Sequence, residues 1–359
     1  MKIALDASYS IGSELSGVGV YSRELMTGLA AFTASAPGAF NDWLWAYRPH
    51  HWRTRWFGPP VPAGVSRSLL WESRAPGGCD LFHGLNQRLP EFCAQPHRRF
   101  RTVATFHDLF MFTGAYSTSD FRARFTAQAL RAAERADAVI AVSGFTASQV
   151  ESLLGVEAAR IHVVHHGVRP LPPPPGPAPS REPMVLSVGS LQVRKNTLGL
   201  IRAFEHMPEG WRLVLAGSLS GFGAPELRAA VEGSQRKAFI ELRGWVSDDE
   251  LARLYARASI FAFPSLDEGF GIPVLEAMAS GVAVLASNTS ALPEVCGDAA
   301  LLVDPRDQDA LSHALSRLME EESLRQDLVS RGRKRASGFT WERCARETWA
   351  VYRKLCDRL

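Results

Sequence analysis

Residues 264–279 have the sequence PSLDEGFGIPVLEAMA, in which Glu268 and Glu276 stand eight positions apart around a Gly-x-Gly turn. The apolar residues 260–263 before it predict a buried strand. Pro273 suits the first position of a helix, because its missing N–H would have no partner there. A strand end, a glycine turn and a helix N-terminus together present backbone N–H groups to an anion. The stretch therefore predicts an anion site, with Glu268 in the loop and Glu276 in the first helical turn.

The two glutamates favour a ligand that carries hydroxyl groups. A carboxylate accepts hydrogen bonds from two sugar O–H groups at once. The structural alternative is a helix cap, since a glutamate in the first turn gains about 0.3–1 kcal/mol from the helix dipole. The spacing and both glycines together favour the ligand role over that alternative.

This stretch resembles the retaining glycosyltransferases of family 4, whose signature is two glutamates separated by seven residues. The residues between them here, GFGIPVL, match the usual filling of that signature. The resemblance extends from Gly17 to about Asp304 and is most specific between residues 184 and 305. It implies an α/β fold of two Rossmann-like domains facing a cleft (GT-B), with the last helix crossing back to the N-terminal domain.

Length and composition are those of an ordinary two-domain protein. The chain has 359 residues, with 46% hydrophobic and 21% charged residues, which suits two domains of about 170–180 residues each. The sequence has no apolar run long enough for a membrane-spanning helix. Asp6 places a charge where a signal peptide needs its apolar core, so no signal peptide is predicted. A net charge of +3 is too small to indicate a nucleic-acid partner. Five scattered cysteines form neither a disulfide framework nor a zinc site, so we expect a cytoplasmic protein.

A proline-rich segment divides the chain near its middle. Residues 171–180 contain six prolines, which predict an extended, semi-rigid linker. We therefore expect an N-terminal Rossmann-like acceptor domain over 1–170, joined by the helix 340–359. A linker over 171–183 and a C-terminal Rossmann-like nucleotide-sugar domain over 184–339 complete the division.

Both halves alternate short apolar runs with amphipathic segments, a pattern typical of parallel sheets covered on both faces. Predicted strands are 2–7, 43–47, 102–106, 138–142, 184–188, 212–215, 239–242, 260–263, 282–286 and 300–303. Predicted helices are 20–31, 122–135, 145–153, 198–206, 249–258, 308–319 and 340–359, and Ser143 is the predicted cap of the third. Ligands of such folds bind at the carboxyl ends of the strands.

A second loop combines a strand end with two cations. Gly189 ends a predicted strand, and Arg194 and Lys195 precede Asn196, which is a good helix cap. The alternative is that both cations are simply solvated. A diphosphate leaving group needs fixed cations, because negative charge accumulates on it as the glycosidic bond breaks. In the resembled family an Arg-Lys pair in this loop serves that purpose.

Three further segments are weaker candidates. Gly17 and Gly19 open a helix, and the resemblance implies that such a loop approaches the donor phosphate or the acceptor. Ser22 stands where the dinucleotide fingerprint needs its third glycine, which argues against a dehydrogenase. His107 directly follows a strand, where a neutral imidazole can bind a sugar; the family has a histidine here near the donor sugar. Val246 lies in a segment that resembles the nucleobase-lining part of the family.

Five tryptophans fall within residues 43–71, interleaved with arginines. Aromatic and basic residues together suit a membrane interface. We prefer the alternative that Trp43, Trp45 and Tyr47 alternate on a half-buried strand. Peripheral contact with the cytoplasmic face of the inner membrane therefore remains the second interpretation.

The resemblance implies a retaining, metal-independent hexosyltransferase with no cofactor besides its nucleotide-sugar donor. Glu276 would hold the ribose hydroxyls, and Arg194 and Lys195 the departing diphosphate. Glu268 and the backbone N–H groups of residues Gly269, Phe270 and Gly271 would hold the donor sugar and its phosphate. No Asp-x-Asp motif directly follows a predicted strand, in agreement with metal independence.

The resemblance leaves the substrates open. Residues 82–90 (FHGLNQRLP) and 194–196 (RKN) look most like family members that build bacterial surface polysaccharides, including lipopolysaccharide, from mannose or rhamnose donors. The expected partners are a GDP- or UDP-linked sugar and a glycan or polyprenol-linked acceptor. A catalytically silent nucleotide-sugar-binding module and a sugar-nucleotide epimerase of the same fold remain alternatives.

Overall fold

The computed structural model describes residues 1–12, 14–34, 42–51, 53, 58–168, 171–172 and 180–357. The chain forms two compact units. Unit 1 comprises Met1–Thr113, Ser119–Gly167 and Thr340–Leu359, and unit 2 comprises Gly114–Thr118 and Val168–Phe339. Most of the predicted linker lies outside the described residues. The first strand of unit 2 begins at Glu182, two residues before the predicted boundary.

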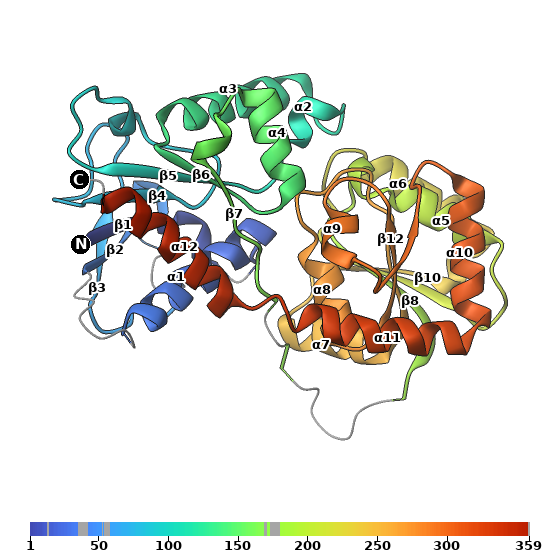
Figure 1. Cartoon of the computed structure of the whole chain (residues 1–359). Coiled ribbons are helices and arrows are strands. Elements are labelled where there is room, and N and C mark those ends of the chain that lie inside the picture. The colour runs from blue at the N-terminus through green and yellow to red at the C-terminus, as the bar shows by residue number, and fades with distance from the viewer. Residues whose placement is uncertain are drawn as a thin grey trace. The chain divides into compact units, whose positions relative to one another are not determined.

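Unit 1 is built on a seven-stranded, wholly parallel sheet in the order β3-β2-β1-β4-β5-β6-β7 (Figure 1). Its strands are β1 (Lys2–Asp6), β2 (Asp42–Tyr47), β3 (Val65–Leu69), β4 (Leu81–Gly84), β5 (Arg101–Phe106), β6 (Ala138–Ala141) and β7 (Ile161–Val163). Its helices are α1 (Gly17–Ala34), α2 (Phe110–Thr113), α3 (Ser119–Arg135), α4 (Gly144–Leu154) and α12 (Trp341–Cys356). Short 3₁₀ turns occupy Ala7–Ser10, Pro49–His51, Glu91–Ala94 and Ala158–Arg160.

Unit 2 contains a six-stranded parallel sheet in the order β10-β9-β8-β11-β12-β13. Its strands are β8 (Glu182–Val188), β9 (Arg212–Ala216), β10 (Ile240–Gly244), β11 (Ala258–Phe263), β12 (Ala283–Ser287) and β13 (Leu301–Val303). Its helices are α5 (Thr197–Glu205), α6 (Ala224–Gly233), α7 (Asp248–Arg257), α8 (Ile272–Ala279), α9 (Leu292–Cys296), α10 (Gln308–Glu320) and α11 (Glu322–Ala336). Val193–Lys195 and Lys237–Phe239 form 3₁₀ turns.

Alternate residues of each central strand enter cores on opposite faces of the sheet. In β1, Ile3 and Leu5 join the core that α1 and α12 cover, whereas Ala4 joins the core beneath α3 and α4. This is the burial pattern of a parallel sheet with both faces covered. The doubly covered α/β fold predicted from the alternation of apolar runs and helices is confirmed.

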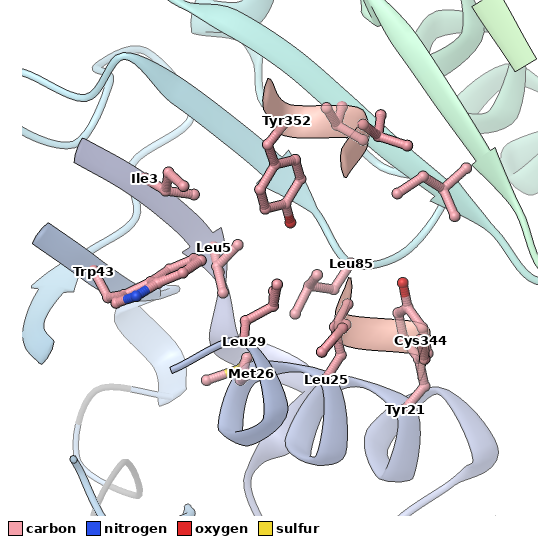
Figure 2. Packing of buried hydrophobic residues seen from close by; sticks show 14 of the residues in the cluster. Ile3, Leu5, Tyr21, Leu25, Met26, Leu29, Trp43, Leu85, Cys344 and Tyr352 are labelled. Carbon is pink, nitrogen blue, oxygen red and sulfur yellow. The ribbon is translucent and has the colours of Figure 1, made fainter. Parts of the chain in front are cut away.

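The last helix, α12, belongs to unit 1, as predicted. The side chains of Trp341, Cys344, Ala345, Thr348 and Tyr352 are buried, at the spacing that places residues on one helical face. Figure 2 shows Cys344 and Tyr352 of α12 in one apolar cluster with residues from α1 and β1. The approach of α12 to α1 is close enough that a Cβ added at Gly28 would lie 3.3 Å from the Ala345 Cβ.

A buried chain of hydrogen bonds links α12 to the sheet. The Tyr352 hydroxyl shares a hydrogen bond with Nδ1 of His83 at 2.5 Å, and Nε2 of His83 shares one with Thr105 at 2.8 Å. The Tyr21 hydroxyl completes the chain on Thr105 at 2.9 Å. Burial, with a smaller contribution from nearby His107, lowers the pKa of His83 to about 3. His83 is therefore neutral at physiological pH, and its ring nitrogens are satisfied inside the core.

Removing the Tyr352 hydroxyl from this series of hydrogen bonds should destabilise unit 1. We expect Tyr352→Phe to lower the free energy of unfolding by about 1–3 kcal/mol, because it leaves a buried histidine nitrogen without its partner. Urea denaturation followed by tryptophan fluorescence measures this, since Trp341 and Trp349 lie on the same helix. Arg346→Gln, at an exposed position of α12, should change the value by less than about 0.5 kcal/mol. Equal stability of the two variants would contradict the role of the hydroxyl.

The strand at the start of the tryptophan-rich segment is part of this core. Trp43, Trp45 and Tyr47 on β2 are all buried, which confirms the strand interpretation over the membrane interpretation for these three. Trp71 is different, because 49% of it is exposed. Residues 52 and 56 lie outside the described part of the chain.

Candidate functional site

The two loops that carry the candidate residues of unit 2 meet at the topological switch of its sheet. The chain runs outward from β8 to β9 and β10, and then returns to place β11 on the other side of β8. The loops after β8 and β11 therefore leave neighbouring strands at the same edge, which is where open α/β sheets bind ligands. The backbone N–H of Leu266 donates to the Arg194 carbonyl at 2.8 Å and joins the loops directly.

Glu268 lies between the two cations predicted to bind diphosphate. Its Oε2 is 3.1 Å from Nη1 of Arg194, and its Oε1 is 2.5 Å from Nζ of Lys195. Glu268 and Arg194 are buried, at 7% and 8% exposed. The alternative of solvated cations is therefore wrong for this loop. Residues 73 positions apart form one compact charged cluster.

The cluster holds Glu268 in its ionised form. Burial by itself raises the pKa of this carboxyl group, but the charges of Arg194 and Lys195 outweigh it. Together with the hydrogen bond from Lys195, these charges lower the pKa of Glu268 from 4.5 to about 2. A carboxylate that stays charged at neutral pH accepts hydrogen bonds from hydroxyl groups and donates none.

This shift predicts how acid affects the fold. Because the native-state pKa lies below the ordinary value of 4.5, the ionised group stabilises the fold above about pH 4.5. That contribution is lost as the pH falls from about 4.5 to about 2. We expect Glu268→Gln to lower the free energy of unfolding at pH 7, and the difference from the unsubstituted protein to shrink across this range. Chemical denaturation along a pH series measures the difference, and a constant difference would contradict the shift.

Glu276 occupies a different place in the helix from the one predicted. The helix α8 begins at Ile272, one residue before Pro273, and Gly271 precedes it with a φ of 111°. Glu276 is consequently the fifth residue of α8, beyond the first turn. Its position is therefore not explained by the helix dipole, which acts within the first turn.

The carboxylate of Glu276 is oriented by a tyrosine from the preceding helix. The Tyr255 hydroxyl, on α7, lies 3.2 Å from Oε2 of Glu276 and the same distance from the Pro273 carbonyl. Both residues are buried, and Tyr255 is fully so. Burial, followed by the charge of Glu276, raises the pKa of Tyr255 well above its ordinary value, so the hydroxyl keeps its proton. Tyr255 was not recognised in the sequence, because it lies 21 residues from its partner.

Two glycines allow the strand ends to approach beneath the Lys195 side chain. Gly217 follows β9 with a φ of 142°, and a Cβ added there would lie 2.1 Å from the Gly189 carbonyl oxygen. Gly189 has a φ of 152°, a backbone conformation that residues with a side chain rarely adopt. The backbone below the cations therefore requires residues without side chains.

The structure adds Asp267 and Ser290, which the sequence interpretation missed, and corrects the predicted role of Asn196. Asp267 is buried, and its carbonyl accepts a hydrogen bond from Arg194. The Ser290 hydroxyl accepts a hydrogen bond from the backbone N–H of Glu268 at 3.0 Å. Asn196 precedes α5 but does not cap it with its side chain, which donates to the Pro305 carbonyl at 2.7 Å. The positive φ angles of Asn196 and Ser290, 51° and 56°, mark both as special backbone positions.

The remaining residues predicted for the site divide between the units. Gly269, Phe270 and Gly271 lie between Glu268 and α8, and Val246 follows β10, all in unit 2. Gly17 and Gly19 form the first turn of α1 in unit 1. A Cβ on Gly19 would lie 2.9 Å from the Tyr9 carbonyl oxygen, so this position is tightly packed, whereas Gly17 faces open space.

His107 follows β5 in unit 1, as predicted. Its Nε2 lies 3.0 Å from the Leu85 carbonyl oxygen, which fixes the proton on that nitrogen. The ring stacks on His166 at 5.4 Å and meets the edge of Tyr21 at 4.7 Å. Burial lowers the pKa of His107 to about 4. The imidazole is therefore neutral at pH 7 and oriented by its neighbours.

Two family models divide the chain between them. Residues 15–170 match glycosyltransferase family 4, and residues 172–335 match glycosyl transferases group 1. An O-antigen chain mannosyltransferase B from Escherichia coli is 35% identical over 77% of this chain and 74% of its own length. An MMP alpha-(1->4)-mannosyltransferase from Mycolicibacterium hassiacum is 34% identical over 64% of this chain and 57% of its own length.

Solved structures with the same fold cover the whole chain. Sucrose-phosphate synthase from Thermosynechococcus elongatus superimposes with a TM-score of 0.79 at 22% identity, covering 100% of both chains. The Anabaena protein HepE, solved with UDP and glucose, gives a TM-score of 0.70 at 17% identity and covers 98% of both chains. At these identities the likeness concerns the fold, which is that of GT-B glycosyltransferases.

Proposed function

Because the chain belongs to the family 4 glycosyltransferases, we propose that this hexosyltransferase moves a mannosyl group from a nucleoside-diphosphate sugar to a glycan or lipid-linked acceptor. The observation that carries the proposal is the buried cluster of Glu268, Arg194 and Lys195 at the switch point of the unit 2 sheet. Relatives named as mannosyltransferases favour mannose over rhamnose as the transferred sugar. We place the reaction in bacterial surface polysaccharide synthesis, at the cytoplasmic face of the inner membrane.

The cluster suggests how the donor is held. Glu268 pairs with both Arg194 and Lys195, and its single negative charge offsets only one of their two positive charges. A diphosphate would therefore meet a net positive charge in the cluster. Glu268 would then accept hydroxyl groups of the donor sugar. The backbone N–H groups of Gly269, Phe270 and Gly271 would face its phosphate. Glu276 would accept the ribose hydroxyls, with its carboxylate oriented by Tyr255.

The proposed reaction retains configuration at the anomeric carbon. The bond from that carbon to the phosphate oxygen breaks, and the electron pair leaves with the diphosphate. The acceptor hydroxyl attacks from the face that the leaving group vacates and forms the new glycosidic bond. Its proton passes to a phosphate oxygen, so no protein nucleophile is required. The neutral His107 would bind the donor sugar.

Arg194 and Lys195 also support a reaction without a divalent metal ion. Two cations fixed in a buried loop supply the positive charge that a departing diphosphate requires. We therefore propose that transfer continues in the presence of a chelator and that no cofactor other than the donor is needed. The described helices include none that is long and apolar enough to cross a membrane. Contact with the inner membrane is proposed as peripheral.

A ligand screen followed by a transfer assay tests the proposal. Thermal unfolding is measured with UDP, GDP, ADP and their sugars, since a ligand that binds the native state raises its apparent stability. The preferred donor is then incubated with an α-mannoside acceptor in EDTA, and the anomeric configuration of the product is read by NMR. We expect GDP-mannose or UDP-linked sugar to stabilise the protein and transfer to proceed with retention. Donor binding without any transfer would indicate a catalytically silent nucleotide-sugar-binding module. Conversion of the donor sugar into its epimer would indicate an epimerase.

A further inference from the structure

Unit 1 has a topological switch of its own, between β1 and β4. The chain runs from β1 outward to β2 and β3, and then crosses to place β4 on the other side of β1. By the rule that locates the cluster of unit 2, a second ligand is expected at the carboxyl edge here. At this edge lie Asp6, the last residue of β1, and the loop 85–88, which follows β4.

A chain of four alternating charges crosses this edge. Asp6 Oδ2 is 3.0 Å from Nη2 of Arg48, whose Nη1 is 2.5 Å from Oε1 of Glu72. Nη2 of Arg88 reaches the same Glu72 oxygen at 2.7 Å. Asp6 and Arg48 are buried, whereas the side chains of Glu72 and Arg88 are 44% and 39% exposed. The chain therefore runs from an interior anchor to an accessible pair.

The inner half of this chain is fixed by several contacts. Asp6 Oδ1 accepts the backbone N–H of Ser8 at 3.1 Å, and the Ser8 hydroxyl accepts the backbone N–H of Arg48 at 3.0 Å. The loop that carries Arg88 folds tightly over β4, because a Cβ on Gly84 would lie 2.5 Å from the Arg88 carbonyl oxygen. The Glu72 carbonyl accepts a hydrogen bond from the backbone N–H of Phe92 at 2.8 Å, so both residues of the outer pair lie in loops that contact the rest of unit 1.

Stability alone does not explain the outer pair. An exposed ion pair contributes about 0–1 kcal/mol, and Asp6 already neutralises the buried Arg48. Within the described part of the chain, Oε2 of Glu72 receives no hydrogen bond. Nε of Arg48, although buried, also has no partner there. The exposed pair therefore retains Oε2 of Glu72 for a ligand at the surface, whereas Nε of Arg48 lies in the interior.

The neighbouring Trp71 indicates what such an edge binds. It immediately precedes Glu72, and 49% of it is exposed. An exposed aromatic residue next in sequence to a carboxylate–guanidinium pair suits recognition of a sugar ring. The C–H face of such a ring packs on an aromatic surface, and its hydroxyls form charge-assisted hydrogen bonds with the charged groups. The two carboxylates and two guanidinium groups cancel one another's charge. This balance favours a neutral sugar over a phosphorylated one.

We propose that Trp71, Glu72 and Arg88 bind the terminal sugar of a neutral glycan acceptor and select it over phosphorylated sugars. The inference rests on the proposed transferase function and identifies the acceptor class for that reaction. Glu72 and Arg88 contact the hydroxyls, and Trp71 covers one face of the ring. Asp6 and Arg48 are positioning residues, because they hold Glu72 in place from the interior.

Acceptor kinetics of conservative variants test the proposal. The probes are p-nitrophenyl α-mannopyranoside, which is neutral, and mannose 1-phosphate. In Glu72→Gln, Arg88→Gln and Trp71→Ala we expect the KM for the neutral probe to rise about tenfold or more, because each loses a contact to the sugar. The donor KM and the thermal shift caused by the nucleotide should stay unchanged. Arg346→Gln, an exposed arginine of α12, is the matched control for loss of a positive charge.

Direct binding separates failure of this inference from failure of the proposed function. Saturation-transfer NMR with p-nitrophenyl α-mannopyranoside detects binding in the absence of turnover. If no donor supports transfer but Arg88→Gln abolishes this binding, the transferase proposal fails and the sugar subsite stands. Unchanged acceptor KM and unchanged NMR binding in all three variants would overturn the subsite. A preference for mannose 1-phosphate would overturn it as well. The proposal would also be overturned if Trp71→Ala kept an unaltered acceptor KM but lost binding to anionic phospholipid vesicles. That result would mean that this edge of the unit 1 sheet contacts a membrane surface.

Discussion

Replacing Lys195 by alanine should lower the kcat of sugar transfer by about 10²–10³-fold, while the affinity for nucleoside diphosphate changes by less than about tenfold. The reason is that the negative charge on the diphosphate grows during the reaction. Negative charge accumulates on the diphosphate as the glycosidic bond breaks, so a fixed cation stabilises the transition state more than the bound donor. Lys195 is held for this task by Glu268 at 2.5 Å and by the ring of Phe263, whose centroid lies 4.7 Å from its Nζ.

The fold should survive this substitution, because Arg194 continues to neutralise Glu268 at 3.1 Å. Steady-state turnover and nucleotide titration measure the two effects separately. Lys195→Arg keeps the positive charge and should lose less activity than the alanine variant. Lys237→Ala, at an exposed position of the same unit, should behave as the unsubstituted protein. A kcat for Lys195→Ala within about threefold of the unsubstituted value would contradict the role assigned to this cation.

The fold was largely predictable, because each strand–helix unit carries its own local signal. Ser143 caps α4 as predicted, with its Oγ accepting the backbone N–H of Thr146 at 3.0 Å. The strands β3, β4 and β7 were not predicted. These elements contain three to five residues. β3 carries polar residues (VSRSL) and β4 contains a histidine and a glycine (LFHG), so neither shows a continuous apolar run, and pairing with neighbouring strands defines them.

Only the residues of the candidate site that belong to recognisable motifs could be predicted from the sequence. The proximity of Glu268 to Arg194 and Lys195 follows from the parallel order of β8 and β11, and the loops could be placed at one edge once that order was assumed. The partners that orient these groups have no such signal. Tyr255 beside Glu276, and Arg48 beside Asp6, are ordinary residues of a helix and a strand end. Their roles depend on the register of the fold, which no single segment encodes.

Glu276→Ala should weaken binding of the nucleoside diphosphate by about 10–150-fold, the range expected for loss of a hydrogen bond to a charged group. If Glu276 accepts the ribose hydroxyls, the loss appears equally in donor and free nucleotide, and kcat at saturating donor changes little. Calorimetric titration with the nucleotide selected by the ligand screen measures this. Tyr255→Phe leaves the carboxylate but removes the hydroxyl 3.2 Å from it. This variant should therefore show a smaller loss.

Deoxynucleotides determine whether the carboxylate acts on the ribose itself. With the unsubstituted protein, a 2′-deoxy or 3′-deoxy nucleoside diphosphate should bind about tenfold or more weakly than the parent nucleotide. With Glu276→Ala the same deletion should cost little, because the partner of the missing hydroxyl is already gone. The double-mutant cycle formed by protein variant and ligand variant then gives a coupling free energy for the contact. Additive losses would mean that Glu276 affects nucleotide binding through the packing of α7 and α8, with no contact to the ribose.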